Sequence, residues 1–497
     1  MSEVMASLQH FRPEVALTVA LLLVVVVDAI GAAWRNVVLL ALTGVGLVAA
    51  LALAVADRHF SGELFQGMAV ADPMGSFFKG LLIGASLLVA VAFNFWNSRE
   101  LRGLGQGEFY ALLLAVTLSN LLLATANDLA MLYLALEMVS ITSYVMVAYL
   151  KGDRLSNEAS LKYILFGAVS TGTMLYGLTL LYGLTGTTKL PEIGAALATA
   201  VTDETRFAAY AITFLVLAGF GFKTAVVPFH FWCPDVYQGA PTPVTAFLSV
   251  APKAAGFAVM ARFFFQGLAT GTPGMWDQAA TIEWPQVLMV ISALTMTVGN
   301  VAALTQTNMK RLLAYSSIAH AGYIMMGVVA FSENGARAMM IYLLAYLFMN
   351  LGAFLVVTLV HAHDGTFDLR DYPGLYRRAP FLTLAMAIFL FSLMGIPPLV
   401  GFMGKLYVFA AVIEKGPGYY WYAVVGAVNA AIAAYYYVRV LKTMIIDQPA
   451  EEKPALSLSL FDGLAVAAFL AANVLPLLFW ARIEAFARAA TALYAAR

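Results

Sequence analysis

The sequence contains a single cysteine, Cys233, among 497 residues. One thiol excludes an intrachain disulfide and any iron–sulfur or zinc site built from four cysteines. The sequence also lacks a Walker phosphate loop and a GxGxxG motif after a strand, which excludes the common nucleotide-binding motifs. A redox cofactor that drives this protein must therefore lie on another chain.

Charge is almost as scarce as cysteine. Only 11% of the residues are charged, the formal net charge is +0, and no long basic run is present, so nothing supports binding to nucleic acid. In contrast, 62% of the residues are hydrophobic and the mean hydropathy is +0.83. This composition lies far outside that of soluble domains and indicates a membrane protein with many spans.

The apolar runs predict an all-α polytopic membrane protein with about 14 transmembrane helices, since one span needs about 20 mostly apolar residues. The start of the chain lacks a signal-peptide cleavage pattern, so we expect the first apolar run to remain as a span. We place the spans near residues 14–31, 37–56, 77–96, 108–126, 128–150, 158–184, 206–230, 243–261, 285–306, 311–331, 335–361, 380–413, 419–446 and 458–481.

Two of these spans are predicted to be broken. Prolines interrupt 206–230 and 380–413, and each of these spans also contains a lysine. Broken helices that recur five spans apart are typical of transporters made of two inverted repeats. We therefore predict an N-terminal three-helix module (1–106), a first antiporter-like repeat of helices 4–8 (107–262), a second of helices 9–13 (263–446), and a C-terminal helix with a tail (447–497).

The N-terminal module and the tail are expected to contribute little chemistry. The first three spans carry almost no internal charge, and Lys79 stands close enough to a helix start to extend its amine to the interface. The tail, with Arg482, Glu484 and Arg488, is expected to lie along the membrane surface. A weak excess of Lys and Arg in alternate loops places both termini outside.

Lys223, Lys253 and Glu137 are the strongest candidates for function. An ionisable residue at membrane depth is unfavourable by a few kcal/mol and usually marks an ion or proton pathway. A proline five residues after Lys223 breaks the helix, which is tolerated only where the freed groups line a cavity or pack against protein. Glu137 lies several turns from either helix end, where a carboxylate takes up a proton or finds a cation. The alternative is a structural role, with Glu137 in an ion pair.

For three further residues, a functional and a structural interpretation both remain open. Lys405 follows a Pro-Pro break and either serves the pathway or caps the carbonyls that the break frees. Lys162 either belongs to the pathway or forms an i,i+4 pair with Glu158. His320 is either a proton relay, because its ordinary pKa is near neutrality, or a hydrogen-bonded core residue.

Other polar residues are assigned to packing or anchoring. His230 and Trp232 are expected at the membrane boundary, and the tyrosine run 435–437 is taken as helix packing. His361, His363 and Asp364 do not have convincing metal-ligand spacing, so no metal site is predicted.

The run PFHFWCPDVYQGAPTPV, from Pro228 to Val244, resembles the signature of the antiporter-like subunits of respiratory complex I, the proton-pumping NADH:quinone oxidoreductase. The segments around Glu137 and around Lys162, EASLKYILFGAVSTG, fit the same family, and the resemblance covers roughly residues 110–440. A lysine at 405, and an end after about fourteen spans, are more similar to the chain N branch than to its sister subunits. Cys233 stands where relatives often have another small residue.

The resemblance implies roles for these positions. Glu137 and Lys223 would form a coupling pair in the cytoplasmic-side half-channel, which Lys162 modulates. Lys253 and His320 would lie on a central polar axis, and Lys405 would face the exit half-channel.

The resemblance also implies partners and location. NAD, FMN, iron–sulfur clusters and quinone would be bound by other subunits of the complex, and this chain would bind no cofactor and no metal. The expected location is the bacterial inner membrane, with both termini periplasmic. The sequence leaves two alternatives open: a subunit of a cation/proton antiporter of related fold, and a membrane scaffold whose buried charges only hold helices together.

Overall fold

The computed structural model describes residues 2–31, 35–93, 99–101, 103–270, 279–280, 282–449 and 453–491. Within these ranges, 13 helical segments are long and apolar enough to cross a membrane. The helices of the first half are α1 (Ser2–Leu8), α2 (Arg12–Ile30), α3 (Arg35–Ala56), α4 (Pro73–Ala92), α5 (Gln106–Ala124), α6 (Leu129–Val147), α7 (Arg154–Thr185), α8 (Leu190–Ala200), α9 (Arg206–Thr224), α10 (Trp232–Gly239) and α11 (Thr242–Arg262).

The second half contains α12 (Trp284–Ala303), α13 (Met309–Val329), α14 (Glu333–Asp364), α15 (Leu375–Arg378), α16 (Pro380–Met394), α17 (Val400–Ile413), α18 (Tyr420–Ile445), α19 (Leu460–Val474) and α20 (Trp480–Ala489). Two short antiparallel hairpins pair β1 (Gly62–Leu64) with β2 (Ala69–Ala71), and β3 (Ala269–Thr270) with β4 (Ala279–Ala280). Short 3-10 or π turns cover Phe65–Gly67, Arg99–Leu101, Phe263–Gly267, Leu369–Asp371, Pro417–Tyr419 and Leu475–Phe479.

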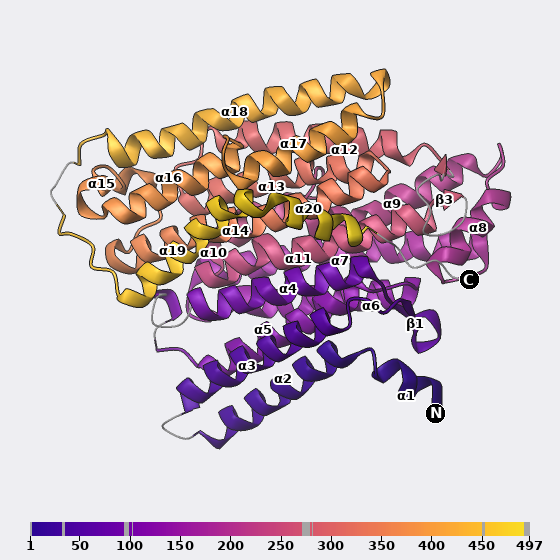
Figure 1. Cartoon of the computed structure of the whole chain (residues 1–497), viewed down its shortest axis with the longest axis horizontal. Helices are drawn as coiled ribbons and strands as arrows, with labels where there is room; N and C mark the ends of the chain where they lie inside the picture. Colours follow the sequence, from indigo (N-terminus) through magenta and orange to yellow (C-terminus); the bar gives the residue numbers. More distant parts are fainter. Residues whose placement is uncertain are drawn as a thin grey trace.

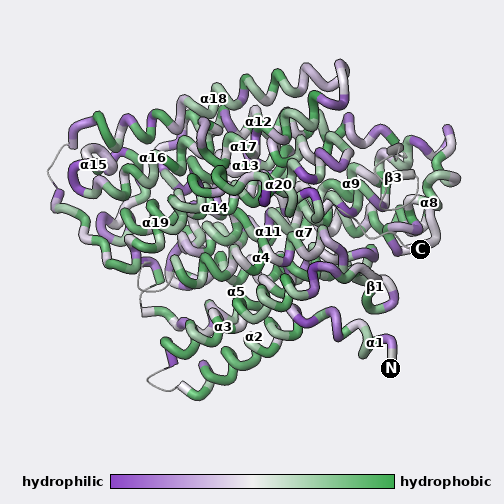
Figure 2. The backbone as a smooth tube through the Cα atoms, viewed as in Figure 1, coloured by the Kyte–Doolittle hydropathy of each residue, from purple (hydrophilic) through white to green (hydrophobic). Residues whose placement is uncertain are grey.

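The helices run side by side along the long axis of the molecule, and both chain ends lie at the same end of the bundle (Figure 1). Hydrophobic residues cover most of each long helix, whereas hydrophilic residues collect mainly toward the helix ends and connections (Figure 2). Counting the α16–α17 pair as one more crossing gives the predicted fourteen. An even number of crossings returns the chain to its starting side, as observed.

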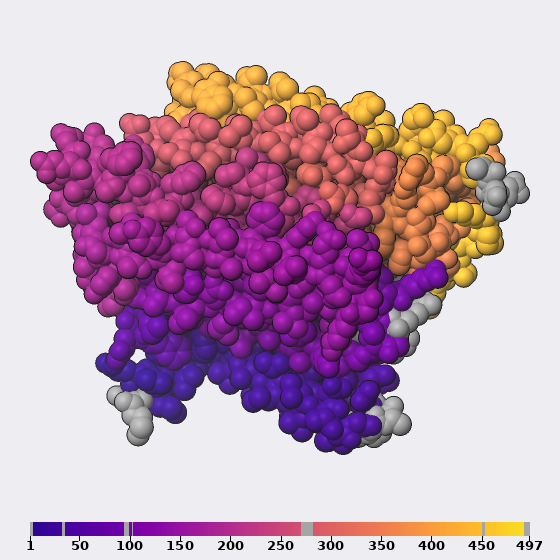
Figure 3. Space-filling view, turned by 180° about the vertical axis from the view of Figure 1, so that it is seen from behind, coloured from indigo at the N-terminus to yellow at the C-terminus, as the bar shows by residue number. Residues whose placement is uncertain are grey.

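Up to α18, the order of the chain is also its order across the molecule, whereas α19 and α20 return over α14, and Phe486 of α20 contacts Phe77 of α4 (Figure 1). Seen from behind, the N-terminal helices form one edge, the C-terminal segments form the opposite edge, and the middle of the chain lies between them (Figure 3). The most buried spans are consequently α11, α13 and α14. A polar side chain on these three helices meets protein rather than lipid.

Short polar side chains fix where several helices begin. The carboxylates of Asp72, Asp128 and Asp153 accept hydrogen bonds from amides in the first turns of α4, α6 and α7. Asn308 and Ser332 do the same for α13 and α14. Each side chain satisfies amide groups that have no partner within the helix. The polar residues at the span boundaries are therefore helix caps.

Both predicted broken helices are present. The seventh span stops at Thr224, where Ala225 takes a left-handed conformation with φ 59°, and the chain resumes in α10. The twelfth span divides into α16 and α17, and Gly395 at the break has φ 86°. The inverted relationship between the two repeats, and the domain boundaries drawn from it, stay predictions.

The structure corrects or adds to the sequence expectations at four places. The third span begins at Pro73, four residues before the predicted start, because Asp72 caps it; its predicted end at 94–96 lies outside the described residues. The connection 185–205 contains the helix α8. The position of the tail along the membrane surface stays a prediction, and the structure adds that Arg337 pairs with Glu484 at 3.2 Å, which holds α20 against α14.

Lys79 is the fourth place, and here the sequence expectation is wrong. Its amine does not extend to the interface but lies 2.7 Å from a carboxylate oxygen of Glu14, with both side chains buried. The N-terminal module therefore contains a buried ion pair. The sequence prediction missed it because Glu14 and Lys79 lie on different helices, α2 and α4, and each stands near a helix end where a free side chain would reach water.

Candidate functional site

Lys223 lies in the last turn of α9, immediately before the break. Its side chain is 3% exposed, and its amine donates to the hydroxyl of Ser140 on α6 at 3.0 Å. The helix α11 comes close to the stem of this lysine, because a Cβ at Gly256 would lie only 3.0 Å from Lys223 Cγ. A glycine at this position gives the lysine room to cross between α6 and α11.

The break itself is held by polar contacts from other elements. The amide of Val227 donates to Thr295 Oγ1 on α12 at 3.0 Å, and the indole of Trp232 donates to the carbonyl of Phe222 at 3.1 Å. The first contact satisfies a backbone amide at the break, and the second adds a side-chain donor to the carbonyl of Phe222, which also accepts from the amide of Ala225 at 3.2 Å. They also place the end of α9, and hence Lys223, in one position.

Glu137 does not form a contact ion pair with Lys223: within the described residues, no ion pair of Glu137 shorter than 4 Å is found. Glu137 lies close enough for an electrostatic interaction with the lysine and stands beside Tyr133. Its side chain is half-buried, at the edge of an exposed apolar face of α6 that includes Leu134 and Ile141. The carboxylate therefore faces partly inward and partly toward whatever covers α6.

Lys253 occupies the centre of the molecule on α11, with 2% of its surface exposed. Its amine donates to the carbonyl of Ser317 on α13 at 2.8 Å and also contacts the hydroxyl of the same serine. Cys233 and the hydroxyls of Tyr237 and Tyr346 lie nearby. Lys253 is thus surrounded by polar groups rather than by a neutralising carboxylate.

His320 lies one turn after Ser317 and shares hydrogen bonds with two tyrosines. Its Nδ1 is 2.9 Å from the hydroxyl of Tyr342, and its Nε2 is 3.3 Å from that of Tyr437. The Tyr437 hydroxyl also contacts Ser316. The tyrosine run therefore does more than fill space between helices, which corrects the sequence interpretation: Tyr437 connects α18 to the polar centre.

Lys405 on α17 reaches back to the end of α16. Its amine donates to the carbonyls of Leu393 at 3.1 Å and Met394 at 2.7 Å, and it lies 4.8 Å from the centre of the Tyr323 ring. This contact is the structural alternative predicted for Lys405, in which the lysine caps the carbonyls that the break frees. The same contact holds the amine beside the His320 cluster, because Tyr323 lies one turn after His320 on α13.

Lys162 is not brought to Glu137 or Lys223. Its amine lies 2.7 Å from Glu158, the i,i+4 partner considered from the sequence, and 2.7 Å from Asp235 on α10. Asp235 also binds Arg311 of α13 at 2.5 Å. Lys162 therefore belongs to a partly exposed ion-pair network that links α7, α10 and α13, at the loop side of the broken helix.

The structure also places the polar residues that the sequence analysis assigned to anchoring or left without a metal. His230 and Trp232 are buried, at 6% and 3% exposure, so neither side chain serves as the expected interfacial anchor. The Trp232 ring stacks on Tyr163 with centroids 4.4 Å apart. His361 stacks on Phe367, and Asp364 pairs with Arg378 at 2.8 Å. No cluster of potential metal ligands occurs in the described ranges.

Besides the Glu14–Lys79 pair, two more buried ion pairs escaped the sequence analysis. Arg262 binds both carboxylate oxygens of Asp72, at 2.7 and 2.8 Å, and both side chains are fully buried. Lys310, also buried, lies 3.5 Å from Glu100 and donates to the carbonyl of Ala240. All of these residues stand at ends of apolar runs, where sequence position alone suggests contact with water.

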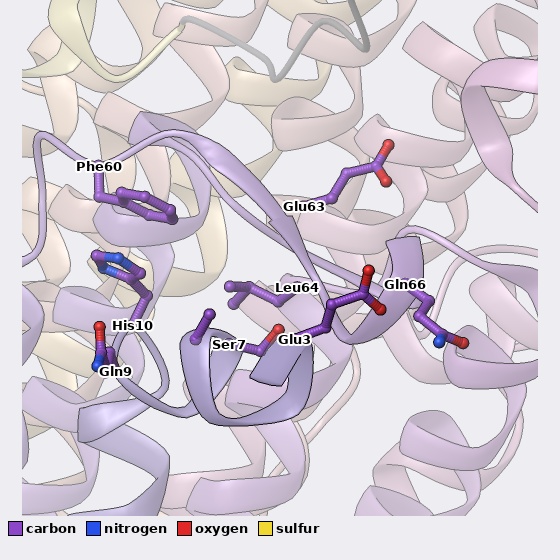
Figure 4. A pocket seen from close by; sticks show the side chains of 9 residues that line it. Glu3, Ser7, Gln9, His10, Phe60, Glu63, Leu64 and Gln66 are labelled. Carbon is purple, nitrogen blue, oxygen red and sulfur yellow. The ribbon is translucent and has the colours of Figure 1, made fainter. Parts of the chain in front are cut away.

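Two pockets within the described part of the chain lie away from the predicted residues. One of about 480 Å³ is formed by α1 and the β1–β2 hairpin, with His10 stacked on Phe60 at one end and Gln66 at the other (Figure 4). Another, of about 680 Å³, opens at the opposite end of the bundle. Among the predicted residues, Lys253, His320 and Lys405 lie together with Ser317 in the buried centre. Lys223 lies against Gly256, three residues after Lys253 on α11. We call this set, from Lys223 to Lys405, the polar row.

This row is made of groups that can accept and donate protons. Amines, an imidazole and hydroxyls alternate along it, and α13 places Ser317, His320 and Tyr323 at intervals of three residues, one helical turn each. A buried amine without a fixed carboxylate partner changes its charge readily when a nearby carboxylate moves or is neutralised. In this row, Glu137 stands close to one end.

The comparisons with known proteins agree with this architecture. A family profile described as "NADH:quinone oxidoreductase/Mrp antiporter, TM" matches residues 126–432. The NADH-quinone oxidoreductase subunit N of Anaeromyxobacter sp. is 46% identical over 97% of this chain and 96% of its own length.

Two solved structures are similar over nearly the whole chain. One chain of the respiratory complex I of Thermus thermophilus is 32% identical, with a TM-score of 0.77, covering 95% of this chain and 98% of that one. A chain of the Mrp complex from Dietzia sp. has a TM-score of 0.83 at 20% identity, covering 97% of each chain, and so shares the fold. By sequence and by fold, the chain belongs to the family of NADH:quinone oxidoreductase and Mrp antiporter membrane subunits.

Proposed function

We propose that this chain is the proton-translocating membrane subunit N of an NADH:quinone oxidoreductase, in which other subunits carry out NADH oxidation and quinone reduction. The observation that carries the proposal is the enclosed row from Lys223 to Lys405, in which both ends coincide with broken helices. Such a row has no use in a scaffold, because burying amines without carboxylate partners is unfavourable.

The proposed roles follow the geometry. Glu137 controls the charge of Lys223 across the space beside Ser140, and Lys253 and His320 relay the proton through the centre. Lys405 releases it from the second broken helix. Lys162 acts at a distance, by fixing α10 through Asp235 at the loop side of the first break.

Partners and location complete the proposal. NAD, FMN, iron–sulfur clusters and quinone belong to partner subunits, and other membrane subunits of the complex cover the exposed apolar faces. A half-exposed Glu137 supports such a partner at α6, because a carboxylate facing lipid would be strongly unfavourable. The subunit resides in the bacterial inner membrane with both termini periplasmic, and its repeats span 107–262 and 263–446.

The test uses the intact complex. The chain, affinity-tagged, is extracted in detergent, and we expect flavin- and iron–sulfur-containing subunits to co-purify with it. In sealed vesicles, Lys223→Ala and Glu137→Ala should lower NADH-driven proton pumping by about 100-fold, the scale of a lost acid–base group. Normal pumping in both variants would favour the scaffold interpretation and contradict the proposal.

A second candidate is a subunit of a cation/proton antiporter, because the fold is shared with the Mrp complex chain. The two functions predict different co-purifying subunits and different driving forces for ion movement. An antiporter subunit would purify without redox subunits and would exchange cations for protons when only an ion gradient is applied.

A further inference from the structure

The C-terminal helix α20 closes a pocket of about 250 Å³ against the N-terminal module. The wall on the α20 side is formed by Phe486, Ala489 and Ala490, which stand at i, i+3 and i+4 and so share one face. The opposite wall comes from α3 and the first two turns of α4, where the rings of Phe77 and Phe486 have centroids 5.8 Å apart. The pocket thus lies between the first and the last parts of the chain.

The interior of this pocket is apolar and open. Ala54, Val55 and Phe77 line it, and a Cβ placed on Gly80 would have no neighbour within 4 Å. Val55 and Phe486 are about half exposed, so the rim of the pocket faces the surroundings of the protein. An apolar cavity of about 150 Å³ already holds a molecule of the size of benzene. The larger pocket here therefore has room for a hydrocarbon segment of several methylene groups.

One end of the pocket is basic. Arg58 and His59 line it just beyond Ala56, the last residue of α3, and hence where an apolar span meets the membrane boundary. Arg58 Nε donates to His59 Nε2 at 3.0 Å, and neither side chain forms an ion pair with a carboxylate of the described residues. A guanidinium without a carboxylate partner attracts anions, and its planar fork matches the geometry of a phosphate group.

The dimensions of the pocket decide between a lipid and a helix of a partner protein. A helix with its side chains is about 10 Å across, so a cavity of about 250 Å³ is too small for even two turns of one. A phospholipid fits both ends of the site. Because Pro73 and Gly80 both line the pocket, its wall on α4 extends about 10 Å along the helix, which suits an acyl chain below a phosphate at the boundary.

We propose that this pocket binds an anionic phospholipid, whose phosphate is held by Arg58 and His59 and one of whose acyl chains lies along Gly80 between α4 and α20. The bound lipid joins the C-terminal helix to the N-terminal module. The site lies outside the polar row, and its occupancy is measured without proton pumping. A failure of this proposal would therefore leave the proposed function intact, and a failure of the proposed function would leave the lipid site intact.

The test uses the complex that co-purifies with this chain, reconstituted into phosphatidylcholine vesicles that contain a small fraction of phosphatidylglycerol with a photoreactive diazirine in one acyl chain. After illumination, mass spectrometry locates the lipid on peptides of the chain. We expect labelling of α4 around Gly80 and of α20 around Phe486. It should be about fivefold stronger than with phosphatidylcholine that carries the same diazirine, since one basic residue contributes about this factor toward an anionic lipid. Equal labelling by the two lipids, or no labelling at these positions, overturns the proposal.

Gly80→Leu should abolish the labelling around Phe486, because the new side chain fills the open space. Gly84→Leu is the matched control, since Gly84 stands one turn later on α4, has equally open space at its Cβ and does not line the pocket. Labelling that persists in Gly80→Leu, or that falls equally in both variants, overturns the proposal.

Arg58→Gln tests the charge by itself, and because Arg58 is exposed the variant should fold normally. Labelling by phosphatidylglycerol should fall about fivefold, while labelling by phosphatidylcholine stays unchanged. The control is Arg154→Gln, which removes another exposed arginine, at the start of α7 and outside the pocket, and should change neither. An unchanged preference for phosphatidylglycerol in Arg58→Gln, or an equal loss in Arg154→Gln, would show that the pocket does not select an anionic lipid and would overturn the proposal.

Discussion

The two broken helices have the same sequence ingredients and different environments. Each combines a lysine with a proline break inside an apolar span, and each places an amine at the end of the first half-helix. At the first break, Lys223 donates to a serine hydroxyl and lies within electrostatic reach of Glu137. At the second, Lys405 donates to two backbone carbonyls.

This difference separates a controllable site from a fixed one. A carboxylate can be protonated or displaced, so the charge of Lys223 depends on its surroundings. Backbone carbonyls neither titrate nor move independently of their helix, so Lys405 has constant acceptors. We infer that the first break responds to the redox subunits, and that the second sets where the proton leaves the row.

The strongest test removes each amine in turn. Lys223→Met and Lys405→Met should both lower proton pumping by about 100-fold, but only Lys405→Met should also destabilise the protein. The reason is that the carbonyls of Leu393 and Met394 lose their donor, at about 1–3 kcal/mol for each unsatisfied group, whereas Ser140 keeps its bond to the carbonyl of Leu136.

Thermal unfolding of the detergent-solubilised complex measures the second effect. Lys405→Arg is the control, since it keeps a donor at this position. Equal unfolding temperatures for the two methionine variants would contradict the distinction between the breaks.

The next test adds one methyl group beside each lysine. In Gly395→Ala the backbone must keep φ at 86°, and the new Cβ would lie 2.8 Å from Lys405 Cδ. The left-handed conformation alone is unfavourable by about 1–2 kcal/mol for a residue with a side chain.

Gly256→Ala has no such backbone strain and brings its Cβ to 3.0 Å from Lys223 Cγ. We therefore expect a larger loss of stability and of pumping for Gly395→Ala than for Gly256→Ala. Thermal unfolding of the solubilised complex and proton pumping in sealed vesicles measure the two effects. Gly463→Ala, where a Cβ would meet open space, is the neutral control. A greater effect of Gly256→Ala would reverse the ranking.

The smallest expected effect concerns the side chains that hold the breaks. Thr295 accepts from the amide of Val227, and Ser392 accepts from the amide of Gly401 at 3.2 Å. Thr295→Val and Ser392→Ala should each lower the free energy of unfolding by about 1 kcal/mol, with pumping reduced only modestly. Thr295→Ser, which keeps the hydroxyl, should behave as the unmodified protein. Loss of pumping without loss of stability would instead place these hydroxyls in the proton route.

The charged residues show how far sequence reasoning reached. Lysines inside long apolar runs, such as Lys223, Lys253 and Lys405, were predictable because several turns separate them from water whatever the tertiary fold. Lys79, Arg262 and Lys310 were not, because each stands near the end of a span, and only neighbouring helices decide whether it meets water or a carboxylate.

The sequence by itself determined the membrane fold, the number of crossings, the two breaks and the buried lysines, because hydropathy and proline act over short stretches of chain. The tertiary structure alone decided the partners of those lysines. Ser140, Ser317, Tyr437 and the carbonyls of α16 lie far from them in sequence or across a break, and hydrogen bonds act only over about 3 Å. Contacts of that range exist only after the helices have packed.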